Sequence, residues 1–230
     1  REHRSESQTM SYLSASRVEL VSEMPLGEVL FDFYGKLKTI TRGYGSFDYT
    51  PTKYVKTDIV KVDILVNNAG TTHRNKPMTE VTEEEFDRIF AVNVKSVFLT
   101  ARHGVPLMKV QGHGMILNVA STAGLRPRPG LAWYNTSKGA MITATKAMAI
   151  ELASFKIRVN AINPVAGETG MLHLFMGEDT PEKRAQFVSS IPWGRLSQPQ
   201  DMANAALFLC SDEADMVTGT CMEVDGGRCI

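Results

Sequence analysis

Tyr134 and Lys138, which stand four residues apart in the stretch YNTSKGA, carry the side chains best suited to moving a proton. If this stretch is helical, residues at that spacing share a face. A lysine ammonium beside a phenol favours the phenolate, so we expect Lys138 to lower the pKa of Tyr134 from about 10 toward neutrality. Tyr134 would then act as an acid or a base toward an alcohol or carbonyl oxygen.

Two further polar side chains could complete this chemistry. Ser121 ends the predicted strand GMILNVAS, thirteen residues before Tyr134, where its hydroxyl could hold a substrate oxygen. Asn93 lies in a predicted helix, where its amide interrupts an apolar face and could bind a water that links Lys138 to solvent. Each residue also has an ordinary explanation, because helical tyrosines usually pack, serines form turns or caps, and helical asparagines are usually solvated. Their combination in this order favours a catalytic site.

Strands and helices alternate from about residue 60 onward, and these elements would position the candidate residues. Thr82 is a candidate N-cap, and acidic residues follow it in the first helical turn, where they are favourable. The alternation implies a parallel sheet with right-handed crossovers. The first strand becomes apolar on both sides toward Val66, as a central strand would. The predicted elements are strands at 60–67, 114–121, 157–163 and 219–227, helices at 82–110, 133–154 and 199–211, and an irregular helical segment at 168–195.

Residues 60–230 resemble the short-chain dehydrogenases/reductases. The resemblance is carried, in order, by Asn67-Asn68-Ala69-Gly70, Asn93, Ser121, Tyr134, Lys138, INPVAGETGM and VTGTCMEVDGG. It implies that Asn93, Ser121, Tyr134 and Lys138 form a catalytic tetrad that reduces ketones or oxidises alcohols with NAD or NADP. It also implies a set of cofactor-binding residues, Asn68, Ala69, Gly70, Tyr134, Lys138, Pro164, Val165 and Thr169.

Within that set the resemblance gives individual roles. Lys138 would hold the nicotinamide ribose, and Thr169 with the backbone of Val165 would hold the carboxamide. The family usually has Pro-Gly where this chain has Pro164-Val165.

The glycine-rich phosphate loop of that family is missing from the sequence. The family begins with a strand and a TGxxxGxG turn, which lets the backbone approach the pyrophosphate at a helix N-terminus. Here GYGSF (43–47) follows a predicted helix, and GHG (112–114) leads into a strand without a third glycine. We therefore expect cofactor binding to be weakened by several kcal/mol, of which each 1.4 is about tenfold.

Residues 1–66 resemble a different family, the C-terminal, elongation-factor-G-like domain of LepA-type translational GTPases. The stretch EMPLGEVLFDFYGKLKTITRGYGSFDY carries most of the likeness. The resemblance implies a ferredoxin-like module that contributes to ribosome binding and has no GTP site. Within it, RVELVSEM (17–24) alternates like a strand and 25–43 has the apolar stripe of an amphipathic helix, whereas 1–16 shows no clear pattern.

Both families contain a segment like VDILVN, so we interpret the chain as a chimera joined there, with domains 1–59 and 60–230 sharing the strand 60–67. We predict an α/β fold. It comprises half of a Rossmann-like parallel sheet, strands 4-5-6-7 of the dehydrogenase order, extended at its N-terminal edge by antiparallel strands and a helix of the ferredoxin-like module. One continuous sheet would cover the edge of strand 60–67, which is otherwise open to aggregation.

The composition excludes few functions, but it does not favour binding to a charged partner such as nucleic acid or a membrane surface. The 25 basic and 25 acidic residues cancel, so we expect neither a nucleic-acid nor a membrane partner. No apolar run reaches the roughly 20 residues of a membrane span. The five histidines and three cysteines lack metal-binding spacings, so we expect no metal site and a cytoplasmic protein with reduced thiols.

Three functions remain open: an NAD(P)-dependent oxidoreductase, a folded but catalytically silent chimera, and a ribosome-associated translation-factor fragment. The segment 168–195 resembles the family's substrate lid and suggests a partly apolar alcohol or ketone substrate, although its apolar residues could simply pack. These residues are Met171, Leu172, Leu174, Phe175, Met176 and Trp193. Helices 82–110 and 133–154 resemble the family's dimer-forming pair, so we expect a homo-oligomer.

Overall fold

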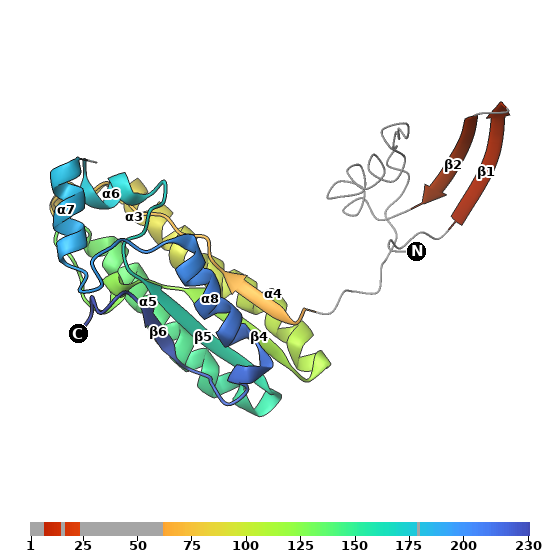
Figure 1. Cartoon of the computed structure of the whole chain (residues 1–230). Helices are drawn as coiled ribbons and strands as arrows, with labels where there is room; N and C mark the ends of the chain where they lie inside the picture. Colours follow the sequence, from red (N-terminus) through yellow and green to blue (C-terminus); the bar gives the residue numbers. More distant parts are fainter. Residues whose placement is uncertain (1–6, 15–16, 24–61, 179) are drawn as a thin grey trace. The chain divides into compact units, whose positions relative to one another are not determined.

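Four parallel strands form the centre of Ile59–Ile230, the second of two units into which this computed structural model divides (Figure 1). The structure describes residues 7–14, 17–23, 62–178 and 180–230. The sheet order is β3-β4-β5-β6, so neighbours in the sheet are also consecutive along the chain. This confirms the predicted Rossmann-like parallel half-sheet. The strands are β3 (Ile64–Asn67), β4 (Gly114–Val119), β5 (Ile157–Pro164) and β6 (Cys221–Val224).

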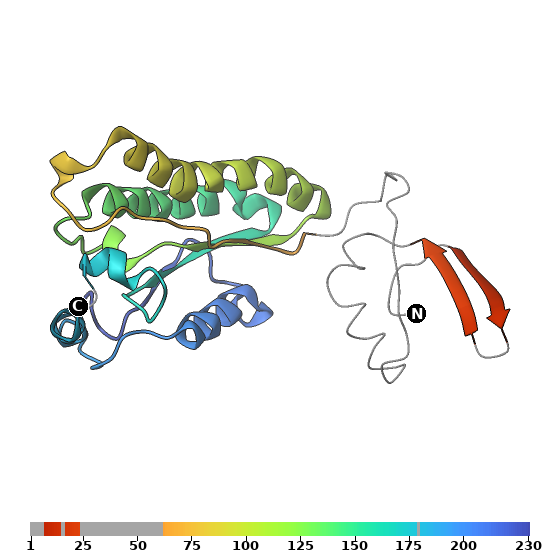
Figure 2. The same cartoon turned by 90° about the horizontal axis from the view of Figure 1, so that it is seen from above.

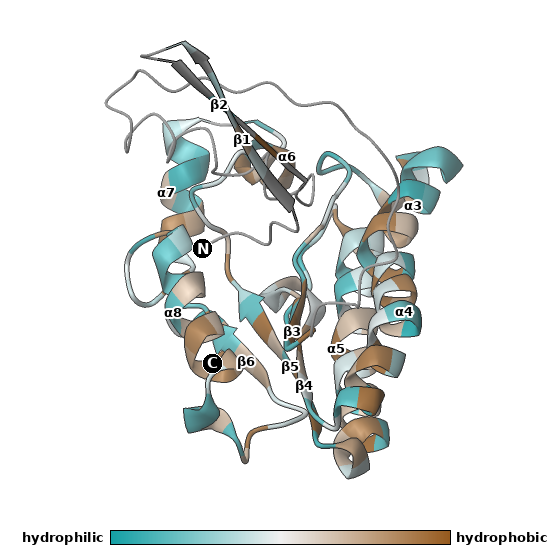
Figure 3. Cartoon of the chain, turned by 90° about the vertical axis from the view of Figure 1, so that its right-hand side faces the viewer, coloured by the Kyte–Doolittle hydropathy of each residue, from teal (hydrophilic) through white to brown (hydrophobic). Residues whose placement is uncertain are grey.

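Helices cover both faces of this sheet, as Figures 2 and 3 show. Helices α4 and α5 pack on one face, and α8 packs on the other. The longer predicted helices are confirmed, and the irregular segment 168–195 contains two short helices. The bounds are α3 (Glu83–Phe90), α4 (Ser96–Gln111), α5 (Ala132–Leu152), α6 (Leu172–Met176), α7 (Pro181–Ser189) and α8 (Pro199–Cys210). Among the described residues there are also 3₁₀ turns at Met78–Glu80, Thr122–Gly124, Ala153–Phe155 and Asp212–Ala214.

The predicted helix 82–110 differs from expectation in one respect. It begins as predicted at Thr82, whose hydroxyl accepts from the Glu85 N–H while the Glu85 carboxylate accepts from the Thr82 N–H. A π-helical turn, Ala91–Lys95, then separates α3 from α4. Such a turn inserts one extra residue into the helix and is frequent at functional sites. The helix ends at Gly112, whose φ of 78° is the left-handed stop that glycine allows.

Alternation along β4 divides the core into two layers. Ile116 points to one side of the sheet, where it packs with Met108 of α4 and Leu152 of α5. Met115 and Leu117 point to the other side, where they pack with Leu209 of α8. Successive side chains of a strand face opposite sides, so a strand buried on both faces is apolar throughout. The central position of β4 follows from this.

The edge strand β3 is less buried than the sequence suggested. Ile64 and Val66 are 48% and 53% exposed, whereas Leu65 packs against the α4 and α5 layer. The prediction of a central, two-sided strand is therefore wrong within the described residues, because β3 pairs there with β4 alone. The face that carries Ile64 and Val66 has no described helix packed on it.

A chain of polar side chains links helices α4 and α5 to strands β3 and β4 of the sheet. Asn67 at the end of β3 donates from Nδ2 to the side-chain Oδ1 of Asn118 at 2.7 Å, and Asn118 donates from Nδ2 to Thr145 Oγ1 at 2.8 Å. Thr100 of α4 donates to Asn67 Oδ1 at 2.7 Å, and Thr145 donates onward to the Met141 carbonyl. Buried networks of this kind rigidify a core when every member is satisfied.

The first unit contains a described hairpin, β1 (Ser7–Ser14) and β2 (Arg17–Glu23), which pair antiparallel as a two-stranded sheet. Strand β2 confirms the alternation noted at 17–24, and β1 lies where no pattern predicted a strand. The hairpin is separate from the four-stranded sheet, so the expected continuous sheet is not found among the described residues. The predicted helix 25–43 and the following strands lie outside the described residues.

No helix in the part of the chain that the structure describes is both long enough and apolar enough to cross a membrane.

The buried asparagine network generates a stability prediction. Asn118→Ala should lower the free energy of unfolding of the second unit by about 2–4 kcal/mol, because Asn67 and Thr145 lose their partner in a fully buried site. Both tryptophans, Trp133 and Trp193, lie in this unit, so tryptophan fluorescence in a urea titration follows its unfolding. The control is Asn204→Ala, an exposed position on α8, expected to change stability by less than about 0.5 kcal/mol. Equal effects of the two substitutions would contradict the prediction.

Candidate active site

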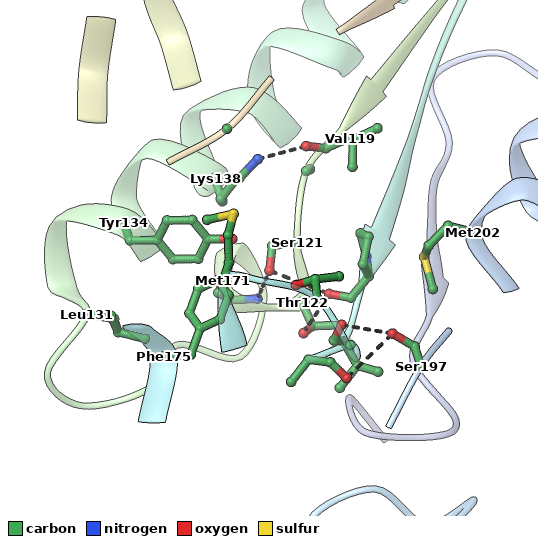
Figure 4. Close-up of a pocket in the computed structure, with 18 of the residues that line it drawn as sticks. Val119, Ser121, Thr122, Leu131, Tyr134, Lys138, Met171, Phe175, Ser197 and Met202 are labelled. Carbon is green, nitrogen blue, oxygen red and sulfur yellow. Dashed lines mark hydrogen bonds between the residues drawn. The ribbon is translucent and has the colours of Figure 1, made fainter. Parts of the chain in front are cut away.

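A cavity of about 260 Å³ lies at the carboxyl ends of β4 and β5, the edge where parallel sheets bind ligands (Figure 4). Its walls come from loops and helices far apart in the sequence. The residue after β3, the turn after β4, helix α5, the loop after β5, and helices α6 and α7 all contribute. Candidate residues in the lining are Asn68, Gly70, Ser121, Tyr134, Lys138, Pro164, Val165 and Thr169.

Helix α5 brings Tyr134 and Lys138 to the same wall of the cavity, as their spacing predicted (Figure 4). Both side chains are buried, with 6% and 4% of their surface exposed. The Lys138 ammonium donates a hydrogen bond to the Val119 carbonyl at 2.8 Å and lies 6.0 Å from the centroid of the Tyr134 ring. The lysine thus ties α5 to the end of β4, and the phenol lies one helical turn away.

The expectation that Lys138 lowers the pKa of Tyr134 is wrong in this structure. Burial raises the pKa of Tyr134 to about 12, because desolvation penalises the phenolate, and the hydrogen bond with Ser121 offsets only part of this. Burial also lowers the pKa of Lys138 to about 8. Sequence spacing places the two groups together but does not show how far both are withdrawn from water.

Ser121 caps a turn and also lines the cavity, while its role toward a substrate oxygen stays a prediction. Its hydroxyl caps the turn Thr122–Gly124 by accepting from the Ala123 N–H at 3.1 Å, and it also lines the cavity beside Tyr134. The contact from Ser121 Oγ to the Pro164 carbonyl is long, at 3.5 Å. A hydroxyl carries one proton, so this weak contact leaves that proton able to turn to an oxygen atom in the cavity.

Asn93 is fully buried, so the solvated alternative is wrong. Its Oδ1 accepts from the Thr71 N–H at 2.8 Å, and its Nδ2 donates to the Thr71 carbonyl and to Ser137 Oγ, both at 2.9 Å. Both amide protons are therefore used within the protein, and Asn93 joins the loop after β3 to helix α5. The bridging water remains a prediction. The π-helical turn supplies the position from which Asn93 reaches both partners.

The residues of the Asn67-Asn68-Ala69-Gly70 turn differ in their positions: some line the cavity and others do not. Asn68 and Gly70 line the cavity, whereas Ala69 is exposed and lies outside the described lining. A Cβ atom at Gly70 would stand 3.4 Å from Lys138 Nζ and 3.7 Å from Asn93 Oδ1. The absence of a side chain at Gly70 therefore keeps the approach to the ammonium open.

These residues fit the nicotinamide end of a dinucleotide. The Lys138 ammonium has three protons and one described acceptor, Val119, so it can donate to ribose hydroxyls over Gly70. Pro164 and Thr169 lie across the cavity. The Val165 N–H donates to the Val224 carbonyl at 3.3 Å, and its carbonyl accepts from Ser197 Oγ at 3.3 Å. Its backbone is thus partly engaged, and its carbonyl retains a second lone pair. The far end of a dinucleotide finds no glycine-rich turn in this sequence.

The lid-like segment 168–195 supports both of the readings left open. Met171 and Phe175 line the cavity, and the Phe175 ring lies 5.3 Å from that of Tyr134. Leu172 and Met176 are instead buried in a cluster with Ile191 and Leu196. Trp193 is 75% exposed and contributes to neither.

Sequence reasoning missed several lining residues, chiefly Arg128, Leu131, Phe187, Gln198 and Met202. Most stand in loops or in a short helix, where no periodicity marks them. The available signal was the loop LRPRPG, which places two arginines between Ser121 and Tyr134.

Two family models match the chain. One, described as "Enoyl-(Acyl carrier protein) reductase", matches residues 51–228, and the other, "Elongation factor G C-terminus", matches residues 1–65. The two matches overlap at residues 51–65, which include the first four residues of the segment VDILVN (62–67), where the sequence suggested a join.

Relatives support both matches, and a solved structure supports the first. A 4-formylbenzenesulfonate dehydrogenase, TsaC1/TsaC2, from Comamonas testosteroni is 57% identical over 166 residues, which cover 72% of this chain and 66% of that protein. Elongation factor 4 2 from Rhodopirellula baltica is 74% identical over 82 residues, covering 33% of this chain and 14% of that protein. The crystal structure of a 3-ketoacyl-(acyl-carrier-protein) reductase from Brucella melitensis complexed with NADH is 54% identical, with a TM-score of 0.70, covering 74% of this chain and 68% of that one.

The burial of Lys138 generates a pH prediction. Between a pKa of about 8 in the folded state and the ordinary 10.5, the folded chain binds fewer protons than the unfolded chain. Stability attributable to this lysine therefore rises with pH across that window. The free energy of unfolding of the parent chain minus that of Lys138→Met should increase by up to about 3 kcal/mol from pH 8 to pH 10.5.

Urea unfolding at several pH values measures this difference. Lys146→Met removes an exposed lysine from the same helix and is the matched control with which Lys138→Met is compared. A difference for Lys138→Met that does not change with pH would show that its ammonium is not desolvated by folding.

Proposed function

Since the chain belongs to the short-chain dehydrogenase/reductase family, we propose that it is an oxidoreductase that uses NAD or NADP to interconvert an alcohol and its carbonyl compound. The single observation that carries this proposal is the convergence of Ser121, Tyr134 and Lys138 on one cavity. One relative is named for an aldehyde, 4-formylbenzenesulfonate, so the carbonyl substrates include aldehydes as well as ketones. The chain spans 66% of that relative, and activity is proposed on this basis.

In the proposed mechanism the Ser121 hydroxyl donates a hydrogen bond to the substrate oxygen, keeps its proton, and holds that oxygen beside Tyr134. With a pKa of about 12, Tyr134 stays protonated at neutral pH and acts as the acid that donates a proton to the developing alkoxide of a carbonyl substrate. Alcohol oxidation runs the transfer in reverse and needs the phenolate, so it is favoured as pH rises. A nicotinamide, when bound, supplies or accepts the hydride. Lys138 would hold its ribose, and Thr169 with the backbone at Pro164 and Val165 would hold its carboxamide.

Cofactor affinity is proposed to be weak. The pyrophosphate and adenosine contacts normally supply binding energy that positions the reacting end, and the turn that makes them is absent from this sequence. Loss of several kcal/mol places dissociation constants near the millimolar range.

We propose that the domains are 1–59 and 60–230. The division of the structure between Asp58 and Ile59 supports this boundary. The likeness of the first unit to elongation factor 4 supports a ferredoxin-like module there, and it is the specific observation that keeps ribosome association as a second candidate function.

Three free thiols, Cys210, Cys221 and Cys229, support a reducing, cytoplasmic location.

A homo-oligomer through helices 82–110 and 133–154 is proposed on the apolar side chains that these helices expose. Phe98 is 57% exposed and Val110 92% exposed on α4, and Ile150 is 83% exposed on α5. Contiguous exposed apolar patches mark association surfaces, and these side chains are the candidates for one on these helices.

The catalytic proposal predicts the outcome of Tyr134→Phe. Turnover should fall by about 10²–10⁴-fold, because the acid is removed, while the ring packing against Phe175 is kept. NADH and NADPH are titrated against the purified chain by fluorescence, and a panel of aldehydes and ketones is then assayed. Thr136→Ala, at an exposed position of the same helix, is the matched control and should retain turnover.

Other results identify the competing functions. No saturable binding at millimolar cofactor would indicate the catalytically silent chimera, and retained turnover in Tyr134→Phe would remove the tyrosine from the mechanism. Co-sedimentation with ribosomes would support the translation-factor alternative.

The oligomer proposal predicts that Phe98→Glu dissociates the oligomer into monomers, because burying an unpaired charge in the interface is strongly unfavourable. Light scattering after size-exclusion chromatography gives the mass. Glu83→Gln, in the first turn of α3, is the control. A monomeric parent chain at micromolar concentration would refute the oligomer.

A further inference from the structure

Three arginines gather beside the cavity without an acidic partner. Arg126 and Arg128 stand in the loop between the Thr122–Gly124 turn and α5, and Arg228 stands near the C-terminal end of the chain. Arg126 donates to the backbone carbonyl of Arg228, which joins the two segments. No ion pair among the described residues involves any of the three. Arg228 Nε is buried without a described hydrogen-bond partner.

Arg128 is the member of this cluster that lines the cavity. Its guanidinium lies 4.2 Å from the centre of the Phe187 ring, and Nη2 donates to Ser190 Oγ at 3.4 Å. Stacking on an aromatic ring fixes the plane of a guanidinium. One long hydrogen bond leaves most of its five N–H donors available.

The loop that carries Arg128 is anchored to the catalytic helix. Asn135, the residue after Tyr134, donates from Nδ2 to the Arg128 carbonyl at 2.9 Å. Asn75 donates to the Pro129 carbonyl at 3.1 Å. The guanidinium is therefore held in a fixed relation to the phenol rather than carried on a free loop.

The charge of Arg128 is not balanced by nearby carboxylates. The described lining of the cavity contains no aspartate or glutamate. Asp225 accepts from the N–H groups of Gly227 and Cys229 at 2.9 and 2.7 Å, so both of its oxygens serve the C-terminal turn. Burial, together with repulsion from Arg228 and Arg126, lowers the pKa of Arg128 to about 10, which leaves it charged at neutral pH. Arg128 is half-buried, and a partly desolvated cation without an ionic partner is unfavourable, so a bound anion would relieve part of that cost.

We propose that Arg128 binds a carboxylate or sulfonate group of the substrate, and that this substrate is an aromatic aldehyde or alcohol whose reacting carbon lies at Tyr134. The aromatic part would lie against the apolar walls formed by Leu131, Phe175 and Phe187. In Figure 4 Lys138 lies on one side of Tyr134 and Leu131 and Phe175 on the other, so the apolar wall for the aromatic ring is separate from the lysine that would hold the cofactor. The reaction rests on the function proposed above, whereas the anion site does not.

Binding of unreactive probes tests the anion site without turnover. Benzenesulfonate and its neutral analogue methyl phenyl sulfone are titrated into the full chain by isothermal calorimetry. The parent chain should bind the sulfonate at least about tenfold more tightly than the sulfone, as charge-assisted hydrogen bonds to a guanidinium require. Arg128→Gln should abolish this difference, with the sulfone affinity unchanged.

Matched variants separate the site from general surface charge. Arg126→Gln removes an exposed arginine of the same loop and should keep the preference for the sulfonate. Arg128→Lys keeps the charge without the planar fork and should retain part of it, which also serves if Arg128→Gln does not fold. Equal binding of both probes by the parent chain, binding of neither, or an equal loss in Arg126→Gln would overturn the proposal.

A kinetic comparison distinguishes failure of the anion site from failure of the oxidoreductase. Benzaldehydes with a para sulfonate or a para methylsulfonyl group are assayed with the parent chain and Arg128→Gln. The proposal is supported if the parent chain prefers the sulfonate aldehyde and Arg128→Gln removes that preference by raising the KM for the sulfonate aldehyde. Equal turnover of both aldehydes overturns the anion site and leaves the oxidoreductase intact. Arg128-dependent probe binding without any turnover leaves the anion site intact and removes the oxidoreductase.

Discussion

The hydrogen bond from the Lys138 ammonium to the Val119 carbonyl fixes the geometry on which the candidate site depends. It joins the second turn of α5 to the last residue of β4, and Ser121 follows that residue by two positions. The phenol of Tyr134 and the hydroxyl of Ser121 are thereby held on one cavity. The bond forms in a buried setting, where an ammonium without an acceptor would be strongly unfavourable, so alternative arrangements of α5 on the sheet are disfavoured.

The network of side-chain hydrogen bonds through Asn67 and Asn118 fixes how the strands and helices that carry the site are aligned with one another. Amide and hydroxyl groups bond in defined directions, whereas the surrounding methyl groups pack without direction. Asn93 does the same for the loop after β3 by binding Thr71 and Ser137. The hydrophobic layers supply stability, and these buried amides select one alignment of helix, strand and loop.

Periodicity predicted the second unit well because its strands and helices bury regular faces. The strand at 114–121 and the helix at 133–154 were found with small shifts at their ends. The π-helical turn at 91–95 was not predicted, since one inserted residue hardly disturbs an apolar pattern. The prediction that the pKa of Tyr134 is lowered was wrong, because residue spacing carries no information on the depth of burial that raises it. Arg128 was missed because a loop has no period, and its contact with Phe187 joins residues that only the fold brings together.

The loop 125–130 carries Arg128 to the cavity. It is separate from the segments that are joined by the Lys138–Val119 hydrogen bond and that carry Tyr134 and Ser121. Its anchors to Asn135 and Asn75 are made by the backbone carbonyls of Arg128 and Pro129, which any side chain at those positions would keep. Under the two proposals, substrate selectivity and proton transfer would be carried by separate residues. Exchange of the Arg128 guanidinium for an apolar or acidic group would then change the substrate while Tyr134 and Lys138 stay the same, which would make this short segment the natural place for divergence among related proteins.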